Sequence, residues 1–469
     1  MQKIQIVEYH KKYAAGLAKM WNLSADSWGG RDVVETEESI IRNNEGSENI
    51  KTWVALAGDE VVGYCGFSEY RDDQGASYIP LLNVRPDYHG KKVGKLLVLR
   101  AVEEACTHPW PRLDLYTWPG NTKATPLYKK CGFFWEDRDD STHLMNFIPY
   151  VMHTEAVGDF FRQADWYADS TREIIVQPDG RKENGFDYYE YRWQHGNSML
   201  RMEFERRGRG LRLIETDDWL VEAWVEDANL AFGRSYKASF RLLNKKDMPL
   251  HVAIQGKDDG NISFALERSL DVHGETVVEG QFQVAEISEE QNTWRTHPGI
   301  VADISINGKQ ARFKVGVLPK FPAQIKAVLP DKECFAGSSG VLFLNVENGF
   351  NEPARFKFPL PQAGFVRLEQ QEVEMALEAG EKKAVPVAYT LKGLGLLTGM
   401  SQVIAQPQGG GTIKFQLPLT VAFAGCGAAF GGEVEDSWFV VNGRYSLVLQ
   451  KFNNALEVSP LVKRAFSAT

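Results

Sequence analysis

The sequence lacks three features that would point to a membrane or an oxidising compartment. Its 469 residues contain no apolar run of about 18 residues, the length that spans a bilayer. The start, Met1-Gln2-Lys3-Ile4-Gln5-Ile6, has no apolar core of the signal-peptide kind. Its five cysteines are widely spaced, with no CxxC pair of the zinc-binding type. Such a sparse, odd set suits buried thiols in a reducing compartment, so we expect a cytoplasmic protein without a metal site.

The chain also lacks an excess of positive charge. The chain has 53 Lys and Arg against 62 Asp and Glu, a net charge of −9. Residues 1–150 are acidic on balance too, so no basic half hides inside the total. This balance argues against nucleic acid or an anionic membrane as the main partner. An acidic surface favours a cationic partner such as an amine.

Strands and helices alternate over residues 1–150, and this pattern predicts an α/β domain with a mixed sheet. The expected strands cover residues 3–9, 52–57, 61–70, 77–84 and 112–117, with one or two more between 133 and 147. The expected helices cover residues 11–22, 35–43, 92–106 and 122–130. At roughly 150 residues per domain, the remaining length leaves room for about two further domains.

The most informative stretch is residues 81–97, which read as a strand, a glycine-containing turn and the start of a helix. A helix start has free backbone N–H groups and the positive end of the helix dipole, so it can hold a phosphate. Gly90 and Gly94 would let a ligand approach the backbone closely. Three lysines add positive charge around the turn: Lys91, Lys92 and Lys95.

A second pattern, Asn-x-x-Ala-x-x-Leu-Tyr-x-x-x-Gly-Phe, runs from Asn121 to Phe133. Together the two patterns resemble the cofactor-binding motifs of the GNAT superfamily, the acyl-CoA-dependent N-acetyltransferases. The resemblance covers residues 1–150. Two positions depart from the family pattern: Lys92 stands where glycine is most frequent, and His89 where Arg or Gln is. The Lys92 side chain would either crowd a diphosphate or point outward and add a cation.

The resemblance implies transfer of an acetyl group from acetyl-CoA to an amine through a tetrahedral oxyanion. It implies that main-chain amides from the turn and helix start hold the CoA diphosphate, namely those of His89, Gly90, Lys91, Lys92, Val93, Gly94 and Lys95. It also implies that the strand segment Leu82, Asn83 and Val84 parts from its neighbour and bonds the pantetheine. The Val84 N–H is then the expected donor to the thioester carbonyl.

Two further residues have expected roles and open alternatives. By the resemblance, Tyr128 donates a proton to the departing CoA thiolate; the alternative is a packing tyrosine. Asn121 either caps the following helix or also touches CoA. Glu69, near a strand end, is the candidate general base, and a water chain is the alternative.

Acceptor specificity is expected from residues 28–44 and from the loop 72–76. Acidic side chains there would attract a cationic amine or simply be solvated: Glu35, Glu37, Glu38, Asp72 and Asp73.

After Pro149 the chain consists of short alternating strands. We expect a small β-rich connecting domain at 151–230. An Asn followed five residues later by Pro recurs 104 residues apart, at Asn244 and Asn348. The repeat predicts two sandwiches, 231–320 and 321–424, which resemble tandem immunoglobulin-like accessory domains. Residues 425–469 read as a hairpin segment around Asn442-Gly443 with no obvious partner domain.

The β region shows no second catalytic motif. Its tryptophans would either line a sugar-binding face or fill small cores: Trp166, Trp193, Trp219, Trp224 and Trp294. Three interpretations stay open. The chain is an active acetyltransferase whose β modules bind substrate or mediate assembly, or a non-catalytic sensor of acyl-CoA, or a carbohydrate-associated protein whose β modules bind glycans.

Overall fold

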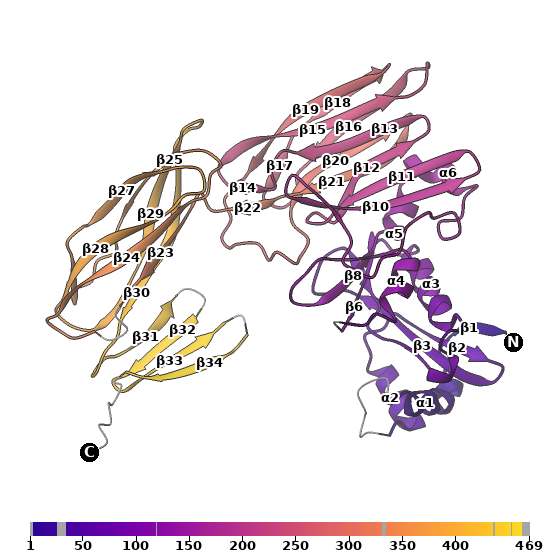
Figure 1. Cartoon of the computed structure of the whole chain (residues 1–469), viewed down its shortest axis with the longest axis horizontal. Coiled ribbons are helices and arrows are strands. Elements are labelled where there is room, and N and C mark those ends of the chain that lie inside the picture. The colour runs from indigo at the N-terminus through magenta and orange to yellow at the C-terminus, as the bar shows by residue number, and fades with distance from the viewer. Residues whose placement is uncertain are drawn as a thin grey trace. The chain divides into compact units, whose positions relative to one another are not determined.

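The computed structural model describes residues 3–25, 34–118, 120–330, 334–434, 437–451 and 453–461. The chain folds as two compact units (Figure 1). Unit 1 comprises Met1–Ala228, Ser235–Gln283 and Gln291–Leu318, and unit 2 comprises Asn229–Arg234, Val284–Glu290 and Pro319–Thr469. Unit 1 holds an α/β domain and a β-sandwich, and unit 2 holds a second sandwich and a C-terminal sheet.

A mixed sheet forms the centre of the α/β domain, as predicted. Its strands run in the order β1-β2-β3-β4-β6-β8-β7, and β5 pairs with β3. The β4–β6 pair is parallel, and the other described pairs of this sheet are antiparallel. The strands are β1 (Ile4–Glu8), β2 (Lys51–Ala57), β3 (Glu60–Glu69), β4 (Ala76–Tyr78), β5 (Leu82–Val84), β6 (Arg112–Thr117), β7 (Phe133–Trp135) and β8 (Thr142–Asn146).

Helices cover both faces of this sheet. Gly16 in α1 lies against Val61 of β3, whereas Gly63 of β3 faces Val93 and Leu97 of α3. A bulge between Val61 and Gly63 puts these two residues of β3 on opposite faces, so α1 and α3 cover opposite sides. The helices are α1 (Ala14–Leu23), α2 (Glu37–Glu45), α3 (Val93–Ala105), α4 (Thr125–Lys130), α5 (Ile148–His153) and α6 (Gly158–Phe161).

One predicted strand, residues 77–84, is broken in the structure. Pro80 lies in the break, and because proline has no N–H it cannot donate to a sheet ladder. Before the break, β4 pairs with both β3 and β6; after it, β5 pairs with β3 alone. The strands β5 and β6 therefore part from each other beyond Tyr78.

The first sandwich packs an eight-stranded sheet against a four-stranded one (Figure 1). The predicted segment 151–230 supplies β9–β13, which share one sheet with β15 of the predicted first sandwich. The larger sheet has the order β17-β19-β15-β13-β12-β11-β10-β9, with β9 (Arg181–Glu183), β10 (Phe186–His195), β11 (Ser198–Glu205), β12 (Gly210–Thr216), β13 (Trp219–Val225), β15 (Arg234–Asn244), β17 (Ile262–Phe264) and β19 (Glu275–Val284). The smaller sheet has the order β18-β16-β20-β21, with β16 (Leu250–Lys257), β18 (Glu267–Val272), β20 (Gly299–Ile306) and β21 (Lys309–Gly316).

The second sandwich repeats this strand order. Its sheets run β23-β24-β28-β26 and β27-β25-β29-β30. The strands are β23 (Ala323–Val328), β24 (Ser339–Asn348), β25 (Ala354–Pro359), β26 (Val366–Leu368), β27 (Glu372–Leu377), β28 (Lys382–Leu391), β29 (Gly395–Pro407) and β30 (Ile413–Phe423). A short ribbon pairs β14 (Asn229–Ala231) with β22 (Leu318–Lys320).

The repeated asparagines explain the sequence repeat. Asn244 Nδ2 donates to the Met248 and Val272 carbonyls at 2.7 and 2.8 Å. Asn348 Nδ2 donates in the same way to the Glu352 and Glu378 carbonyls, each at 2.8 Å. Each amide therefore satisfies buried backbone acceptors where one sheet crosses to the other.

The C-terminal segment forms a four-stranded antiparallel sheet rather than a lone hairpin. The predicted hairpin around Asn442-Gly443 is confirmed as β32 (Ser437–Asn442) and β33 (Tyr445–Gln450). The strands β31 (Ala429–Val434) and β34 (Leu456–Pro460) extend it on both sides. Gly432 of β31 lies against Leu396 of β29, so this sheet docks on the second sandwich.

In the described ranges, every helix falls short of the length and apolar character needed to cross a membrane. Cys65 and Cys131 are buried as expected, but Cys426 is exposed, which corrects the expectation that the thiols are buried.

Candidate active site

A tightly held turn joins β5 to α3. Arg85, 7% exposed, donates from Nε to Asp87 at 2.7 Å and from Nη2 to Glu60 at 3.0 Å. The hydrogen bond from Arg85 lowers the pKa of Asp87. The His89 ring nitrogen Nε2 lies 2.9 Å from the Val84 carbonyl, which can only accept, so Nε2 is the donor. These contacts fix the turn before the helix begins.

The first turn of α3 leaves backbone donors open. Lys92, in the Ncap position, makes no side-chain capping bond. The first helical hydrogen bond runs from the Leu96 N–H to the Lys92 carbonyl. His89 and Lys91 donate their N–H groups to Pro86 and Tyr88 at 3.1 and 3.2 Å, so two of the seven predicted amides are already used. Within the described chain, the remaining predicted amides have no acceptor: those of Gly90, Lys92, Val93, Gly94 and Lys95.

The turn is open to solvent. Gly90, Lys91 and Lys92 are exposed, and a Cβ built on Gly90 meets nothing within 4 Å. The exposed Lys92 side chain therefore does not fill the turn. Lys92 adopts φ 65°, the left-handed conformation that glycine occupies without strain. Gly94, in contrast, packs inward, because its Cβ would lie 3.0 Å from Leu127.

The backbone of β5 alternates between bonding β3 and facing the gap to β6. The Arg85 N–H donates to the Val62 carbonyl, and the Gly66 N–H donates to the Leu81 carbonyl, both at 3.0 Å. Because strand groups alternate in direction, Leu82 and Val84 turn their N–H groups toward the gap. The Asn83 side chain lies on the α1 side of the sheet, with its Nδ2 3.4 Å from the Met20 sulfur.

Tyr128 lies on α4 behind this gap. It is 7% exposed, and its ring meets Phe133 edge-on at 6.1 Å between centroids. Its hydroxyl has no hydrogen-bond partner in the described part of the chain. Burial first, and then the nearby thiols of Cys65 and Cys131, raise the pKa of the phenol, so it remains a proton donor at neutral pH. The ring is thus packed while the hydroxyl stays unbonded.

Asn121 ties the end of β6 to the start of α4. Its Oδ1 accepts from the Ala124 N–H at 3.1 Å, and its Nδ2 donates to Thr117 Oγ1 at 2.7 Å. These contacts hold the turn before α4, but the N-cap residue of the helix is Ala124 and it has no side-chain capping bond, so the prediction that Asn121 caps the helix is wrong.

Glu69 is not brought together with Val84. It is exposed at the end of β3 opposite Ser77, whereas Gly63 of the same strand is opposite Val84. Six residues along a strand span roughly 20 Å. Alternation also puts Glu69 on the face that α3 covers, together with Gly63.

Three tyrosines meet on the opposite face of the sheet, where β6 parts from β4. The Ile79 N–H donates to the Asp114 carbonyl at 2.9 Å, and Tyr116 follows two residues later on β6. Tyr70 and Tyr78 lie 5.2 Å apart between ring centroids, and the Tyr70 and Tyr116 hydroxyls are 2.8 Å apart. Burial, with Tyr116 and nearby carboxylates, raises the pKa of Tyr78 to about 12. We call Tyr70, Tyr78 and Tyr116 the tyrosine face.

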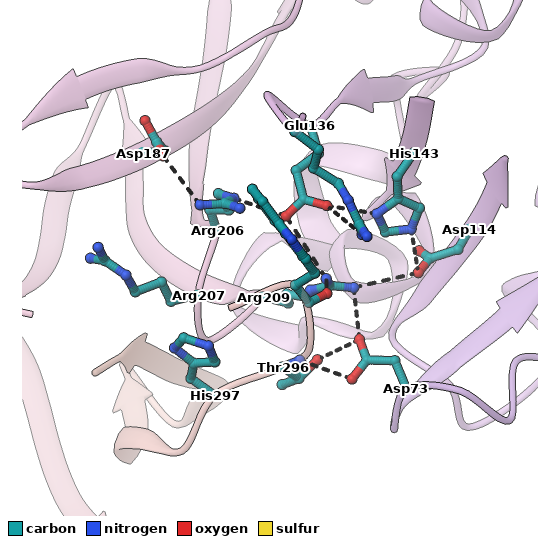
Figure 2. A network of polar contacts seen from close by, with 12 residues as sticks. Asp73, Asp114, Glu136, His143, Asp187, Arg206, Arg207, Arg209, Thr296 and His297 are labelled. Atoms are coloured by element: carbon teal, nitrogen blue, oxygen red, sulfur yellow. Dashed lines mark hydrogen bonds and ion pairs between the residues drawn. The ribbon is translucent and has the colours of Figure 1, made fainter. Parts of the chain in front are cut away.

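A buried polar network supports the tyrosine face (Figure 2). His143 stacks on Tyr116 at 4.5 Å, and its two ring nitrogens lie 2.7 Å from Glu136 and 3.1 Å from Asp114. Arg112 Nε donates to Asp114 at 2.7 Å. Burial alone would raise the pKa of Asp114, but Arg112 and His143 lower it to about 2.

The network corrects one expectation about the acidic residues. Asp73 is 7% exposed and lies 2.8 Å from Arg112 and 2.7 Å from Arg209, so it is not available to a cationic amine. Glu37, Glu38 and Asp72 are exposed. Residues 28–33 of the other predicted acceptor segment lie outside the described residues.

The tyrosine face and its polar network were not predicted from the sequence. The signal was the alternation Arg112-x-Asp114-x-Tyr116 on a central strand, which places three polar or aromatic side chains on one face.

Two of the tryptophans that were candidates for a sugar-binding face pack inside the fold. Trp193 is buried, and the Trp294 ring lies 4.9 Å from the Arg138 guanidinium and 4.7 Å from that of Arg206. Neither presents a free sugar-binding surface.

Comparison with known proteins assigns a class to the α/β domain. The model of the acetyltransferase (GNAT) family matches residues 17–133, about a quarter of the chain. These residues therefore carry a GNAT acetyltransferase domain, and the resemblance inferred from the two motifs is confirmed for this part.

Solved acetyltransferase structures are similar to about a third of the chain. The PaiA N-acetyltransferase of Thermoplasma acidophilum, solved with coenzyme A, is 19% identical over 31% of this chain and 99% of its own, with a TM-score of 0.26. An acetyltransferase from Thermus thermophilus is 21% identical over 31% of this chain and 96% of its own, with a TM-score of 0.26. No curated protein matches the chain.

Proposed function

We propose that the chain is an N-acetyltransferase that moves an acetyl group from acetyl-CoA to a primary amine. The observation that carries this proposal is the uncapped start of α3, where, among the described residues, the amides of Val93, Gly94 and Lys95 are unbonded beside the exposed Lys91 and Lys92. A diphosphate would satisfy these donors and meet the positive end of the helix dipole.

The cofactor would continue from this turn along β5. The N–H groups of Leu82 and Val84 face the gap: that of Leu82 would donate to a pantetheine carbonyl, and that of Val84 to the thioester carbonyl. The His89 ring already occupies the Val84 carbonyl, so only the N–H of Val84 remains for the ligand. A fixed donor aimed at the developing oxyanion stabilises the tetrahedral intermediate.

The amine would attack the thioester carbon, and the C–S bond would then break with the electron pair leaving on sulfur. Tyr128 would donate its proton to that thiolate as the C–S bond breaks and would then take a proton from solvent; burial raises the pKa of the phenol, so it is protonated before this step. Because a thiol of pKa about 8.5 is a fair leaving group, this proton improves the rate without being essential. Glu69 lies far from Val84, so we favour water as the carrier of the ammonium proton.

The acceptor would approach from the sheet face opposite α3, against the tyrosine face. Ring faces of tyrosine suit a cation or an apolar group, and Asp72 adds negative charge nearby. An amine with a second positive or flat apolar group therefore fits this surface better than a simple alkylamine.

For the β modules we propose immunoglobulin-like sandwiches that bind a glycan or protein, or that mediate assembly. Their repeated strand order supports the tandem arrangement. A shallow groove of about 970 Å³ lies along the first sandwich, lined by Trp219, Asp217 and Met248 among others. Glycan-array binding by the full chain, lost on Trp219→Ala, would support the carbohydrate alternative.

We propose acetyl-CoA and an amine as the partners, and we propose no nucleic acid, membrane or metal. The proposed location of the protein is the cytoplasm. A coupled thiol-release assay with acetyl-CoA and a panel of diamines, polyamines, arylamines and amino sugars tests the proposal. Amine-dependent thiol release supports it. Tight acetyl-CoA binding without release for any amine would instead favour the non-catalytic acyl-CoA sensor.

A further inference from the structure

We propose that Arg209, supplied by the first sandwich, is a positioning residue for the acceptor-binding face of the acetyltransferase domain. The inference rests on the proposed function. It makes the sandwich of unit 1 part of the transferase rather than an appended binding module.

The turn that carries Arg209 is held rigidly. It joins β11 to β12, and Arg209 adopts φ 48° within it. The buried Glu205 carboxylate accepts from the N–H groups of Arg207 and Gly208, both at 2.7 Å. A Cβ on Gly208 would lie 2.6 Å from the Gly316 nitrogen, so the turn is pressed against β21 with no room to shift. A rigid turn can fix the position of what it holds.

Arg209 lies near three carboxylates of the acetyltransferase domain (Figure 2): Asp73 is the nearest, and Asp114 and Glu136 lie 3.7 and 3.9 Å away. Its Nη1 lies 2.7 Å from Asp73, while Nη2 donates to the Trp294 carbonyl. Thr296, also from the sandwich, donates to Asp73 from both its N–H and its hydroxyl at 2.9 Å. Arg209 is 4% exposed, so this ion pair is shielded from water. Two residues of the sandwich, Arg209 and Thr296, therefore bind the Asp73 carboxylate.

Asp73 in turn sets the position of the tyrosine face. It lies in the short loop between β3 and β4, three residues after Tyr70. The Tyr70 N–H closes that loop on the Ala76 carbonyl at 3.0 Å, and the Tyr70 hydroxyl meets Tyr116. Arg112 joins Asp73 to Asp114, which holds His143 beneath Tyr116. Displacing Asp73 would thus move two of the three tyrosines.

Docking of the sandwich does not depend on Arg209 alone. Tyr191 donates to the Gly132 carbonyl at 2.6 Å, and the Tyr150 hydroxyl donates to the Arg312 carbonyl at 2.8 Å. Phe147 and Phe204 stack at 4.6 Å across the same boundary. These contacts lie away from Asp73, so an Arg209 variant keeps the sandwich in place while it releases the loop.

The test uses the full chain and the amine that the wild type acetylates fastest. We expect Arg209→Met to raise the KM for the amine about tenfold and to leave the KM for acetyl-CoA within twofold. Asp73→Asn should also raise the KM for the amine, and the double variant should lose less than the two single losses combined, because both substitutions remove the Arg209–Asp73 pair. Arg209→Lys, which keeps the positive charge but loses the planar two-nitrogen fork, should recover part of the loss.

The matched control is Arg241→Met, which removes an exposed pair with Glu275 in the same sandwich and should change neither KM. Equal KM values for the amine in wild type and Arg209→Met, in folded protein, would overturn the inference while leaving the proposed function intact. A rise in both KM values would show a general loosening and would also overturn it. If the wild type acetylates no amine, the proposed function fails and the inference falls with it.

Discussion

The two faces of the acetyltransferase sheet are built in different ways. The proposed cofactor face comes from one short stretch: β5, the turn at His89 to Lys92, and the start of α3. The proposed acceptor face is assembled from distant parts of the chain, with Tyr70, Tyr116 and His143 from the sheet and Arg209 from the sandwich. One face is thus a local motif, and the other is a product of tertiary packing.

This difference assigns different tasks to different segments. Changes within residues 82–95 should alter the binding of acetyl-CoA. Changes in the sandwich should alter the choice or binding of the amine, even though the sandwich lies after the acetyltransferase domain in sequence. The predictions below test that separation, beginning with the largest expected effect.

Gly94→Glu should weaken acetyl-CoA binding at least 100-fold. The new side chain starts on the inward-packed side of the helix, 3.0 Å from Leu127, so it adds bulk there and brings a negative charge close to the proposed diphosphate site. Calorimetric titration with acetyl-CoA measures the change. Gly94→Gln is the matched control, with the same bulk and no charge. If the two variants bind equally weakly, steric disruption rather than charge explains the loss.

Lowering the pH should reduce the free energy of unfolding of unit 1 by about 2 kcal/mol, because Asp114 becomes protonated. The folded-state pKa of Asp114 is lowered to about 2, so its contribution is complete above pH 4. It is then lost as the pH falls from about 4 to 2. Denaturant unfolding at successive pH values, followed by tryptophan fluorescence, measures this slope. Asp114→Asn should flatten it; an unchanged slope would remove Asp114 from the acid response.

Tyr128→Phe should lower kcat about tenfold, with little change in the KM for either substrate. The variant loses the unbonded hydroxyl and keeps the ring contact with Phe133. Steady-state thiol release measures both constants. Since the pKa of Tyr128 is raised, the wild-type rate should not fall between pH 7 and 9 through loss of this proton. A wild-type kcat in the variant would mean that Tyr128 only packs.

Lys92→Gly should stabilise the chain by about 1 kcal/mol, because glycine adopts φ 65° without strain. The midpoint of thermal unfolding should rise by a few degrees. Lys92→Ala, which keeps the strained backbone and loses the charge, separates the two effects. Both variants should bind acetyl-CoA two- to fivefold more weakly, since each removes one exposed cation. Unchanged affinity in both would exclude Lys92 from the cofactor site.

The contrast between the faces also explains what the sequence could predict. The turn and helix start at Gly90 to Lys95 were predictable because backbone donors and glycine spacing are properties of neighbouring residues. The break at Pro80 was missed because the strand pattern continues through it. Asp73 was misread as a solvated or amine-attracting carboxylate, since its partners Arg209 and Thr296 are more than 130 residues away. His143 was missed because its contacts with Asp114 and Glu136 form only when β8 pairs with β6 on one side and β7 on the other.

The most direct test of the account is a crystal structure of the full chain with acetyl-CoA bound. We expect the diphosphate at hydrogen-bond distance from the N–H groups of Val93, Gly94 and Lys95, and the thioester in the gap between β5 and β6. A cofactor bound elsewhere, with these amides bonded only to water, would contradict the central claim.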